Sequence, residues 1–300
     1  MPRWLLWTLL TLLSWGIWAV LIKLIDGQLS EAHSQVISTL GVVPILIALA
    51  LTKESPAVGN RRRGIALAFG SGVLSCLGNI ACYQAISHAK AATVVPLTAL
   101  SPLVTVLLAI PLLKERVNGI QWVGIGIAIV AVLLFSVEPD AAVVSAAISP
   151  WLLLALAAVV LWGITGLLQK MSTNFVSARS SAIWFLAAFI PVAGVILFNN
   201  PLPRDISART WLLATALGFT LALGNLTILL AFASGGKASI ITPLAGLYPV
   251  VSIPIAILVL GEHVTGREAL GIALALAAVV LLSYQSQPDA VPAPAPKMDV

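Results

Sequence analysis

Two stretches of this sequence are copies of one another, KAATVVPLTALSP at residues 90–102 and KASIITPLAGLYP at residues 237–249. A second pair has the same spacing of 147 residues, SWGIWAVLIK at 14–23 and LWGITGLLQK at 161–170. Leu, Ala and Val alone would not place Trp, Lys and Pro in register, so the match indicates an internal duplication.

Around these copies the chain consists of apolar runs bounded by charged or turn-forming residues. Of its 300 residues 60% are hydrophobic and 9% are charged, whereas a soluble domain carries charge on roughly a quarter of its residues. About 20 apolar residues span a bilayer as a helix, and barrel strands would be about half as long. We predict an all-α integral membrane protein with ten transmembrane helices, at residues 4–25, 34–51, 64–86, 93–113, 118–137, 151–171, 180–198, 209–233, 239–260 and 266–284.

The duplication divides the spans into two sets of five, at residues 4–137 and 151–284. Because five is odd, the second copy enters the membrane from the opposite side, so the repeats are inverted. Inverted repeats that enclose a central site are typical of secondary transporters. The Pro- and Ala-rich residues 285–300 are predicted to form a disordered cytoplasmic tail.

The positive residues are unevenly divided between the predicted loops. With the amino terminus inside, eleven Lys and Arg residues fall on the cytoplasmic side and five on the other, chiefly because of Arg61, Arg62 and Arg63. The positive-inside rule therefore favours a multi-pass protein of the cell inner membrane with both termini in the cytoplasm.

The paired WG dipeptides, the Pro-containing fourth spans and the endings KERV at 114–117 and GEHV at 261–264 resemble the EamA-like branch of the drug/metabolite transporter superfamily. The resemblance covers about residues 4–284. It implies a ten-helix carrier of small metabolites such as amino acids, often exported. Glu115 and Glu262 within these endings are interpreted as structural caps or ion-pair partners.

The residues that enzymes require are absent from the predicted spans. All eleven Asp and Glu residues lie in loops, tails or span ends, and there is no His/Glu metal spacing, phosphate loop or nucleophile elbow. Cys76 and Cys82 are interpreted as small packing residues. We therefore expect no enzymatic activity, no cofactor, no metal and no nucleic-acid partner, with membrane lipid and a small-molecule substrate as the partners.

Aromatic and polar side chains inside the spans are the candidates for substrate binding. Lipid offers polar groups no hydrogen-bond partner, so they should face a cavity lined by spans one, three, four, six, eight and nine. The alternative is that the aromatic rings only pack and the polar groups only join helices. The predicted substrate-binding residues are Trp15, Trp18, Asn79, Tyr83, Ser101, Trp162, Asn225 and Tyr248.

Two further sets of paired residues suggest moving parts. Proline frees backbone carbonyls, so Pro96, Pro102, Pro243 and Pro249 are predicted hinges in spans four and nine, with static kinks as the alternative. Inversion places Lys23 and Lys170 at opposite mouths. They are either gates that attract an anionic group or side chains that snorkel to the interface.

These features predict a secondary transporter that moves a small polar, zwitterionic or polar-aromatic metabolite by alternating access. Export rests on the family resemblance alone. The alternatives are a flippase for a lipid-linked sugar, a facilitative sugar or nucleoside carrier, and a channel or structural membrane protein. An intramembrane enzyme is the weakest of them, because no acid, base, nucleophile or metal site is apparent.

Overall fold

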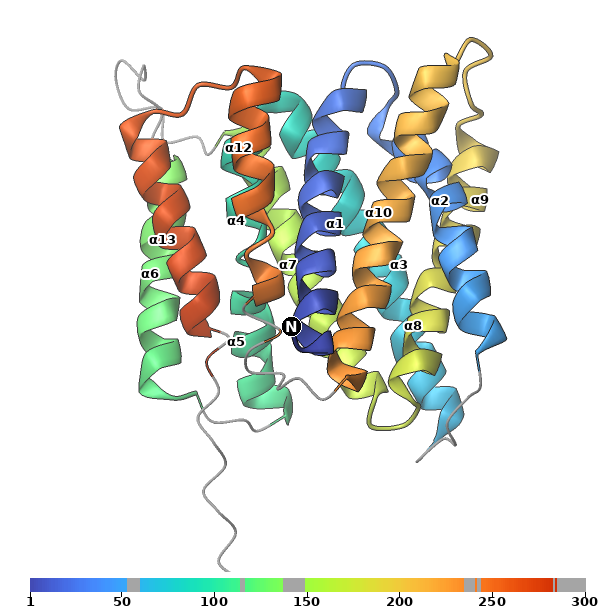
Figure 1. The fold of residues 1–300 in the computed structure, drawn as a ribbon, viewed down its shortest axis with the longest axis horizontal. Coiled ribbons are helices and arrows are strands. Elements are labelled where there is room, and N and C mark those ends of the chain that lie inside the picture. Colours follow the sequence, from blue (N-terminus) through green and yellow to red (C-terminus); the bar gives the residue numbers. More distant parts are fainter. Residues whose placement is uncertain are drawn as a thin grey trace, which may run out of the picture.

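The computed structural model describes residues 1–52, 60–113, 117–136, 149–234, 241, 244–282 and 284. These residues form a bundle of helices and contain no strand (Figure 1). The helices are α1 (Arg3–Ile25), α2 (Glu31–Leu51), α3 (Arg61–His88), α4 (Ala91–Thr98), α5 (Ser101–Leu113), α6 (Gly119–Ser136), α7 (Pro150–Ser172), α8 (Ala178–Ala187), α9 (Phe189–Asn199), α10 (Ala208–Ala233), α12 (Pro249–Leu260) and α13 (Gly266–Leu282). The predicted tail, at 285–300, lies outside the described residues.

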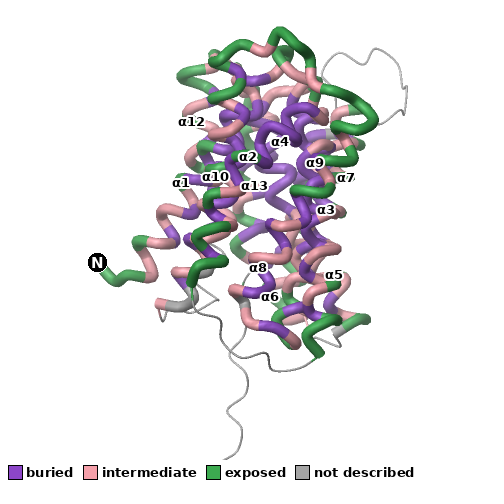
Figure 2. Tube along the Cα trace, turned by 90° about the vertical axis from the view of Figure 1, so that its right-hand side faces the viewer, coloured by how far each residue is buried: buried purple, intermediate pink, exposed green. Residues whose placement is uncertain are grey.

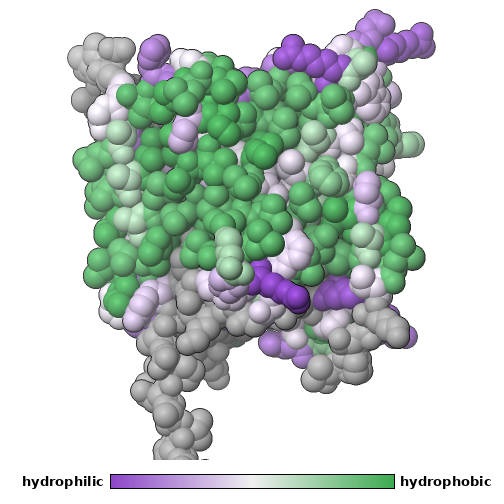
Figure 3. All heavy atoms as spheres, in the orientation of Figure 1, coloured by the Kyte–Doolittle hydropathy of each residue, from purple (hydrophilic) through white to green (hydrophobic). Residues whose placement is uncertain are grey.

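The helices account for the ten predicted spans and confirm the all-α membrane fold. Seven helical stretches of the described chain are long and apolar enough to cross a membrane, and Gly119–Phe135 and Leu244–Leu260 are shorter apolar helices. The tenth span is α13. On the face that Figure 3 shows, the middle of the bundle is apolar and hydrophilic side chains lie near its two ends.

Capping residues explain why two helices begin earlier than predicted. The Ser30 hydroxyl accepts a hydrogen bond from the His33 amide, and the Asn60 side chain accepts one from the Arg63 amide. Both bonds satisfy amide groups that the first turn of a helix leaves unpaired. The polar first turns of α2 and α3 therefore belong to the helices, although the apolar runs begin only at residues 34 and 64.

Three of the predicted spans are interrupted shortly before a proline. The proline ring clashes with the carbonyl four residues earlier, which is Thr98 for Pro102 and Ala187 for Pro191. Accordingly α4 ends at Thr98, and α8 ends at Ala187. The chain also turns at residues 247–248, directly before Pro249 starts α12. The break between α8 and α9 was not expected from the sequence.

The two repeats run in opposite directions and interlock. In Figure 1 α1 ascends from the amino terminus while α7 descends, and α13 ends at the same end of the bundle at which α1 begins. The first helix of each repeat packs in the other repeat, α1 against α10 and α12, and α7 against α3 and α5. All eight residues of α4 are buried, and Figure 2 shows buried residues concentrated in this interior.

The two ends of the bundle differ in charge. Every Asp and Glu among the described residues lies at the end that carries the α1–α2 turn, which we call the acidic end: Asp26, Glu31, Asp205, Glu262 and Glu268. The opposite end, which we call the basic end, carries Arg3, Arg61, Arg62, Arg63, Lys170 and Arg179. By the positive-inside rule the basic end remains the predicted cytoplasmic side.

At the acidic end, Glu262 of the second repeat caps a helix of the first. Its two carboxylate oxygens accept hydrogen bonds from the Ala91 and Ala92 amides at the start of α4, both at 2.8 Å. Beside this cap, the Lys90 ammonium pairs with Glu268 at 2.9 Å. Glu262 therefore acts as a cap, as expected from the sequence, while Glu115 lies outside the described residues.

Removing this cap should weaken the contact between the repeats. Glu262→Ala leaves two amides of the first turn of α4 unpaired, so we expect a loss of about 1–2 kcal/mol of stability. Thermal unfolding of the detergent-purified protein measures the change. The control is Asp205→Ala, which removes an exposed carboxylate at the same end. Equal stability of the two variants would show that the cap contributes nothing.

Candidate functional site

Three predicted aromatic residues meet where the repeats cross. The Trp18 ring of α1 lies 5.7 Å from the Trp162 ring of α7 and 6.4 Å from the Tyr83 ring of α3, measured between ring centroids. Trp18 and Tyr83 are 4% and 3% exposed. The described residues at this crossing thus form a packed aromatic cluster, which occupies the place where a hollow was expected.

Trp15 and Tyr248 form a second contact between the repeats. Their rings meet edge to face with 6.1 Å between the centroids. Tyr248 immediately precedes α12, so the break in span nine places its ring against α1. The predicted aromatic residues therefore form two groups, one around Trp18 and one around Trp15.

Glycine allows Trp15 and Trp162 to lie against the opposite repeat. A Cβ at Gly78 would stand 2.6 Å from Cδ1 and Nε1 of Trp162, and a Cβ at Gly224 would collide with the Trp15 ring. The two Trp residues are equivalent in the duplication, and so are the two glycines. The same contact is thus made twice, so the inverted repeats are related by an approximate twofold axis.

Three polar atoms near this interface are buried without a hydrogen-bond partner among the described residues. They are the indole nitrogens of Trp15 and Trp18 and the hydroxyl oxygen of Tyr83. A buried unpaired polar group costs about 1–3 kcal/mol, and native proteins retain few of them. Trp162 differs, because its indole donates to the Ser75 carbonyl at 3.4 Å. The unpaired groups are therefore the strongest mark of a ligand site in this region.

Asn79 joins this region through a residue that the sequence analysis missed. Its amide nitrogen donates to the Gln35 side-chain oxygen at 3.2 Å, and the Gln35 amide nitrogen lies 3.7 Å from the Cys76 sulfur. Gln35 is fully buried. The available signal was the set of polar residues on one face of α2, at positions 31, 34, 35 and 38, of which only position 31 lies before the predicted span.

Two predicted site residues lie outside both aromatic groups. Asn225 donates from its side chain to the Leu221 carbonyl of its own helix at 2.9 Å. Ser101 begins α5, and its carbonyl oxygen would stand 2.9 Å from a Cβ at Gly163. Asn79 and Asn225 are equivalent in sequence, but within the described part of the chain only Asn79 bonds to another helix.

The predicted hinges and gates occupy distinct positions. Pro96 lies inside α4, Pro102 is the second residue of α5, and Pro249 is the first residue of α12. Pro243 lies outside the described residues. Lys23 donates to Asp26 at 3.0 Å and to the Ile86 carbonyl near the end of α3 at 2.9 Å. Lys170 is exposed near the end of α7, at the opposite end of the bundle.

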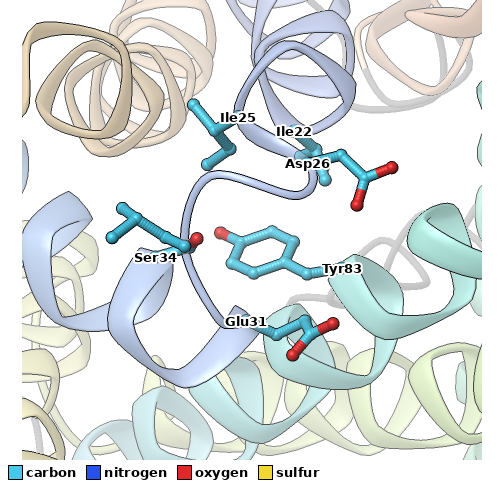
Figure 4. A pocket seen from close by; sticks show the side chains of 7 residues that line it. Ile22, Ile25, Asp26, Glu31, Ser34 and Tyr83 are labelled. Atoms are coloured by element: carbon cyan, nitrogen blue, oxygen red, sulfur yellow. The ribbon is translucent and has the colours of Figure 1, made fainter. Parts of the chain in front are cut away.

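A pocket opens at the acidic end between the α1–α2 turn and α3 (Figure 4). Its enclosed volume is about 10 Å³, roughly the space that one water molecule needs. Tyr83 lines this pocket and also contacts Trp18, so it connects the pocket with the aromatic cluster. The lining residues are Ile22, Ile25, Asp26, Leu29, Glu31, Ser34 and Tyr83. Among the described residues no three His, Cys, Asp or Glu side chains come together as metal ligands.

Two inverted repeats that meet at a central site are an architecture found in secondary transporters. The model of the EamA-like transporter family matches residues 2–137 and 149–284, which together make up most of the chain. The chain belongs to this family, and the protein is therefore a multi-pass membrane transporter of small solutes.

Two further similarities agree with the duplicated fold. An uncharacterized protein of Methanocaldococcus jannaschii is 32% identical over 103 residues, which cover 34% of this chain and 74% of that relative. That relative is accordingly about as long as one repeat. A crystal structure of another protein matches with a TM-score of 0.61 at 17% identity, over 92% of this chain and 95% of the other, and shows the fold alone.

Proposed function

We propose that this protein is a secondary carrier that moves a small polar or zwitterionic solute, such as an amino acid, across the cytoplasmic membrane by alternating access. The proposal is supported chiefly by one observation. Polar groups of Trp15, Trp18 and Tyr83 are buried without described partners where the inverted repeats cross, next to a pocket at one end. A solute that binds at the crossing would satisfy them.

The chemistry of these groups supports a zwitterionic substrate. Trp15 and Trp18 are three residues apart on α1 and therefore face the same side. Indole N–H groups only donate, so they suit the carboxylate of a solute, and the Tyr83 hydroxyl can add a further hydrogen bond. Ring faces and the side-chain oxygen of Gln35 are suited to an ammonium group.

The direction of transport follows from two separate arguments. The positive-inside rule places the basic end in the cytoplasm, so the pocket at the acidic end opens to the outside. In that orientation the aromatic cluster separates the pocket from the cytoplasm. The resemblance to exporters then favours efflux, in which the solute leaves the cluster through the pocket.

Transport by purified protein tests the proposal. In proteoliposomes loaded with unlabelled L-amino acids, we expect uptake of a radiolabelled L-amino acid that saturates and shows counterflow. Asn79→Ala and Tyr248→Ala should each reduce the rate by about tenfold, because each removes a contact worth about 1.4 kcal/mol in the transition state. The control is Thr220→Ala, because the bonds that Thr220 makes to described residues go to carbonyls of its own helix.

Each contrary outcome points to a different conclusion. Flux that does not saturate would indicate a pore, and saturable flux of sugars or nucleosides without amino acids would indicate the alternative carrier. Unchanged rates in both site variants would show that these residues do not bind the substrate.

A further inference from the structure

Two carboxylates of the second repeat hold the start of α4 at the acidic end. The backbone amides of Ala91 and Ala92 donate to Glu262. Directly before them, the Lys90 ammonium donates to both carboxylate oxygens of Glu268, at 2.9 and 3.0 Å. Each of these bonds joins the first repeat to the second, so α4 cannot separate from the second repeat at this end unless they break.

The duplication places a neutral residue at the position in the first repeat that corresponds to Glu268. That residue is Gln121, 147 positions earlier. The local geometry is the same in both copies. The Thr265 amide donates to Glu268 at 2.7 Å. The Asn118 amide donates to Gln121 at 3.1 Å. Gln121 carries no charge, however, and its amide nitrogen donates to the Leu282 carbonyl at 3.1 Å. At this position the basic end therefore has a neutral hydrogen bond where the acidic end has an ion pair.

This difference between the ends biases alternating access. In inverted repeats, opening one end and opening the other rearrange equivalent contacts, so identical contacts would give the two open states equal free energies. Only an interaction that differs between two states shifts their populations. Opening the acidic end breaks an ion pair that opening the basic end leaves intact. The pocket at the acidic end has room for about one water molecule, so a larger solute cannot pass through it in this conformation.

We propose that the Lys90–Glu268 ion pair is a latch that holds the acidic end closed, so that the carrier without substrate opens more readily at its basic end. The proposal rests on the proposed carrier function and adds the control of its resting state. The two side chains are 39% and 17% exposed, so water reaches them and they can separate without leaving a deeply buried charge. With the basic end in the cytoplasm, the resting carrier takes up its solute from inside the cell.

Alkylation of a buried cysteine measures opening at the latch. Ala92 is 1% exposed and lies in the first turn of α4. We would introduce Ala92→Cys after Cys76→Ala and Cys82→Ala have removed the two native thiols, and measure how fast N-ethylmaleimide modifies the detergent-purified full chain. A buried thiol reacts only when the structure opens around it, so the rate reports how often the acidic end opens.

Removal of either charge should speed this alkylation. Glu268→Gln keeps a group that can bond to the Thr265 amide, as Gln121 does in its own copy, and should raise the rate about fivefold. Lys90→Gln should have the same effect, and the double variant no more than either, because each single change already breaks the pair. The control, Asp205→Asn, should leave the rate unchanged. An unchanged rate in Glu268→Gln, or effects that multiply in the double variant, would overturn the proposal.

Ionic strength provides a second measurement on the same proteins. Salt screens a partly exposed ion pair, so raising NaCl from about 0.05 to about 1 M should speed alkylation when the latch is intact and have little effect in Glu268→Gln. Equal responses to salt would overturn the proposal. These rates are measured without flux. Saturable transport with unchanged alkylation rates would remove the latch and leave the carrier function in place, whereas faster alkylation without saturable transport would remove the carrier function.

Discussion

Gly218→Ala is expected to cost about 3 kcal/mol of stability or more, because α2 and α10 touch through their backbones at this residue. A Cβ at Gly218 would collide with the Ser38 carbonyl oxygen and stand 2.5 Å from its carbon. Gly41 makes the reciprocal approach, since its Cβ would collide with the Thr215 carbonyl oxygen. Backbone atoms cannot turn aside as a flexible side chain can, so the helices would have to separate.

Thermal or denaturant unfolding in detergent measures this loss. Gly126→Ala is the matched control, because α6 leaves open space around a Cβ at that position. It should be neutral or slightly stabilising, since alanine favours a helix over glycine by about 1 kcal/mol. Equal stability of the two variants would show that the α2–α10 contact is looser than the structure indicates.

Pro102→Ala is expected to slow transport by about tenfold or more while substrate affinity changes less. Alanine restores an amide N–H that can bond to the Thr98 carbonyl, and it removes the clash that ends α4. An interior proline disfavours a continuous helix by about 3 kcal/mol, so the substitution favours the unbroken form by a similar amount. If alternating access requires the bend in one state, that state becomes less populated.

The control is Pro111→Ala, because Pro111 lies inside α5 without interrupting it. Counterflow rates and substrate titrations on the same proteoliposomes separate turnover from affinity. Wild-type turnover in Pro102→Ala would show that the break between α4 and α5 is a static kink and not a hinge. A loss of similar size in Pro111→Ala would show that the effect is not specific to the break.

Features that repeat along the chain were predictable without coordinates. Residue type and spacing predict the ten spans, the inverted duplication and the interruption of span four. A helix can cross the hydrocarbon because its backbone groups bond to one another, and proline interrupts it because proline lacks an amide hydrogen. The role of Glu262 as a cap was predictable for the same reason, since the carboxylate stands at the end of a span. The first turns of α2 and α3 were missed because the spans were predicted from apolar runs, and these first turns are polar.

Contacts between helices could not be predicted in this way. Asn79 and Asn225 occupy equivalent positions, yet one bonds to Gln35 and the other to its own helix. Trp15 and Trp162 are equivalent too, but only Trp162 finds an acceptor for its indole among the described residues. The pocket at the acidic end combines a turn, a helix start and a ring of α3, which lie far apart in the sequence.

The amino-acid sequence by itself therefore determined the class of fold, the number of spans and their inversion. The thickness of the bilayer sets the length of each apolar run, and the Lys and Arg residues of the loops set its orientation, so both can be recognised segment by segment. Only the tertiary structure decided which polar groups pair, which stay unpaired and where a pocket opens. Those outcomes depend on how closely particular helices approach, and that distance is set by residues of both repeats together.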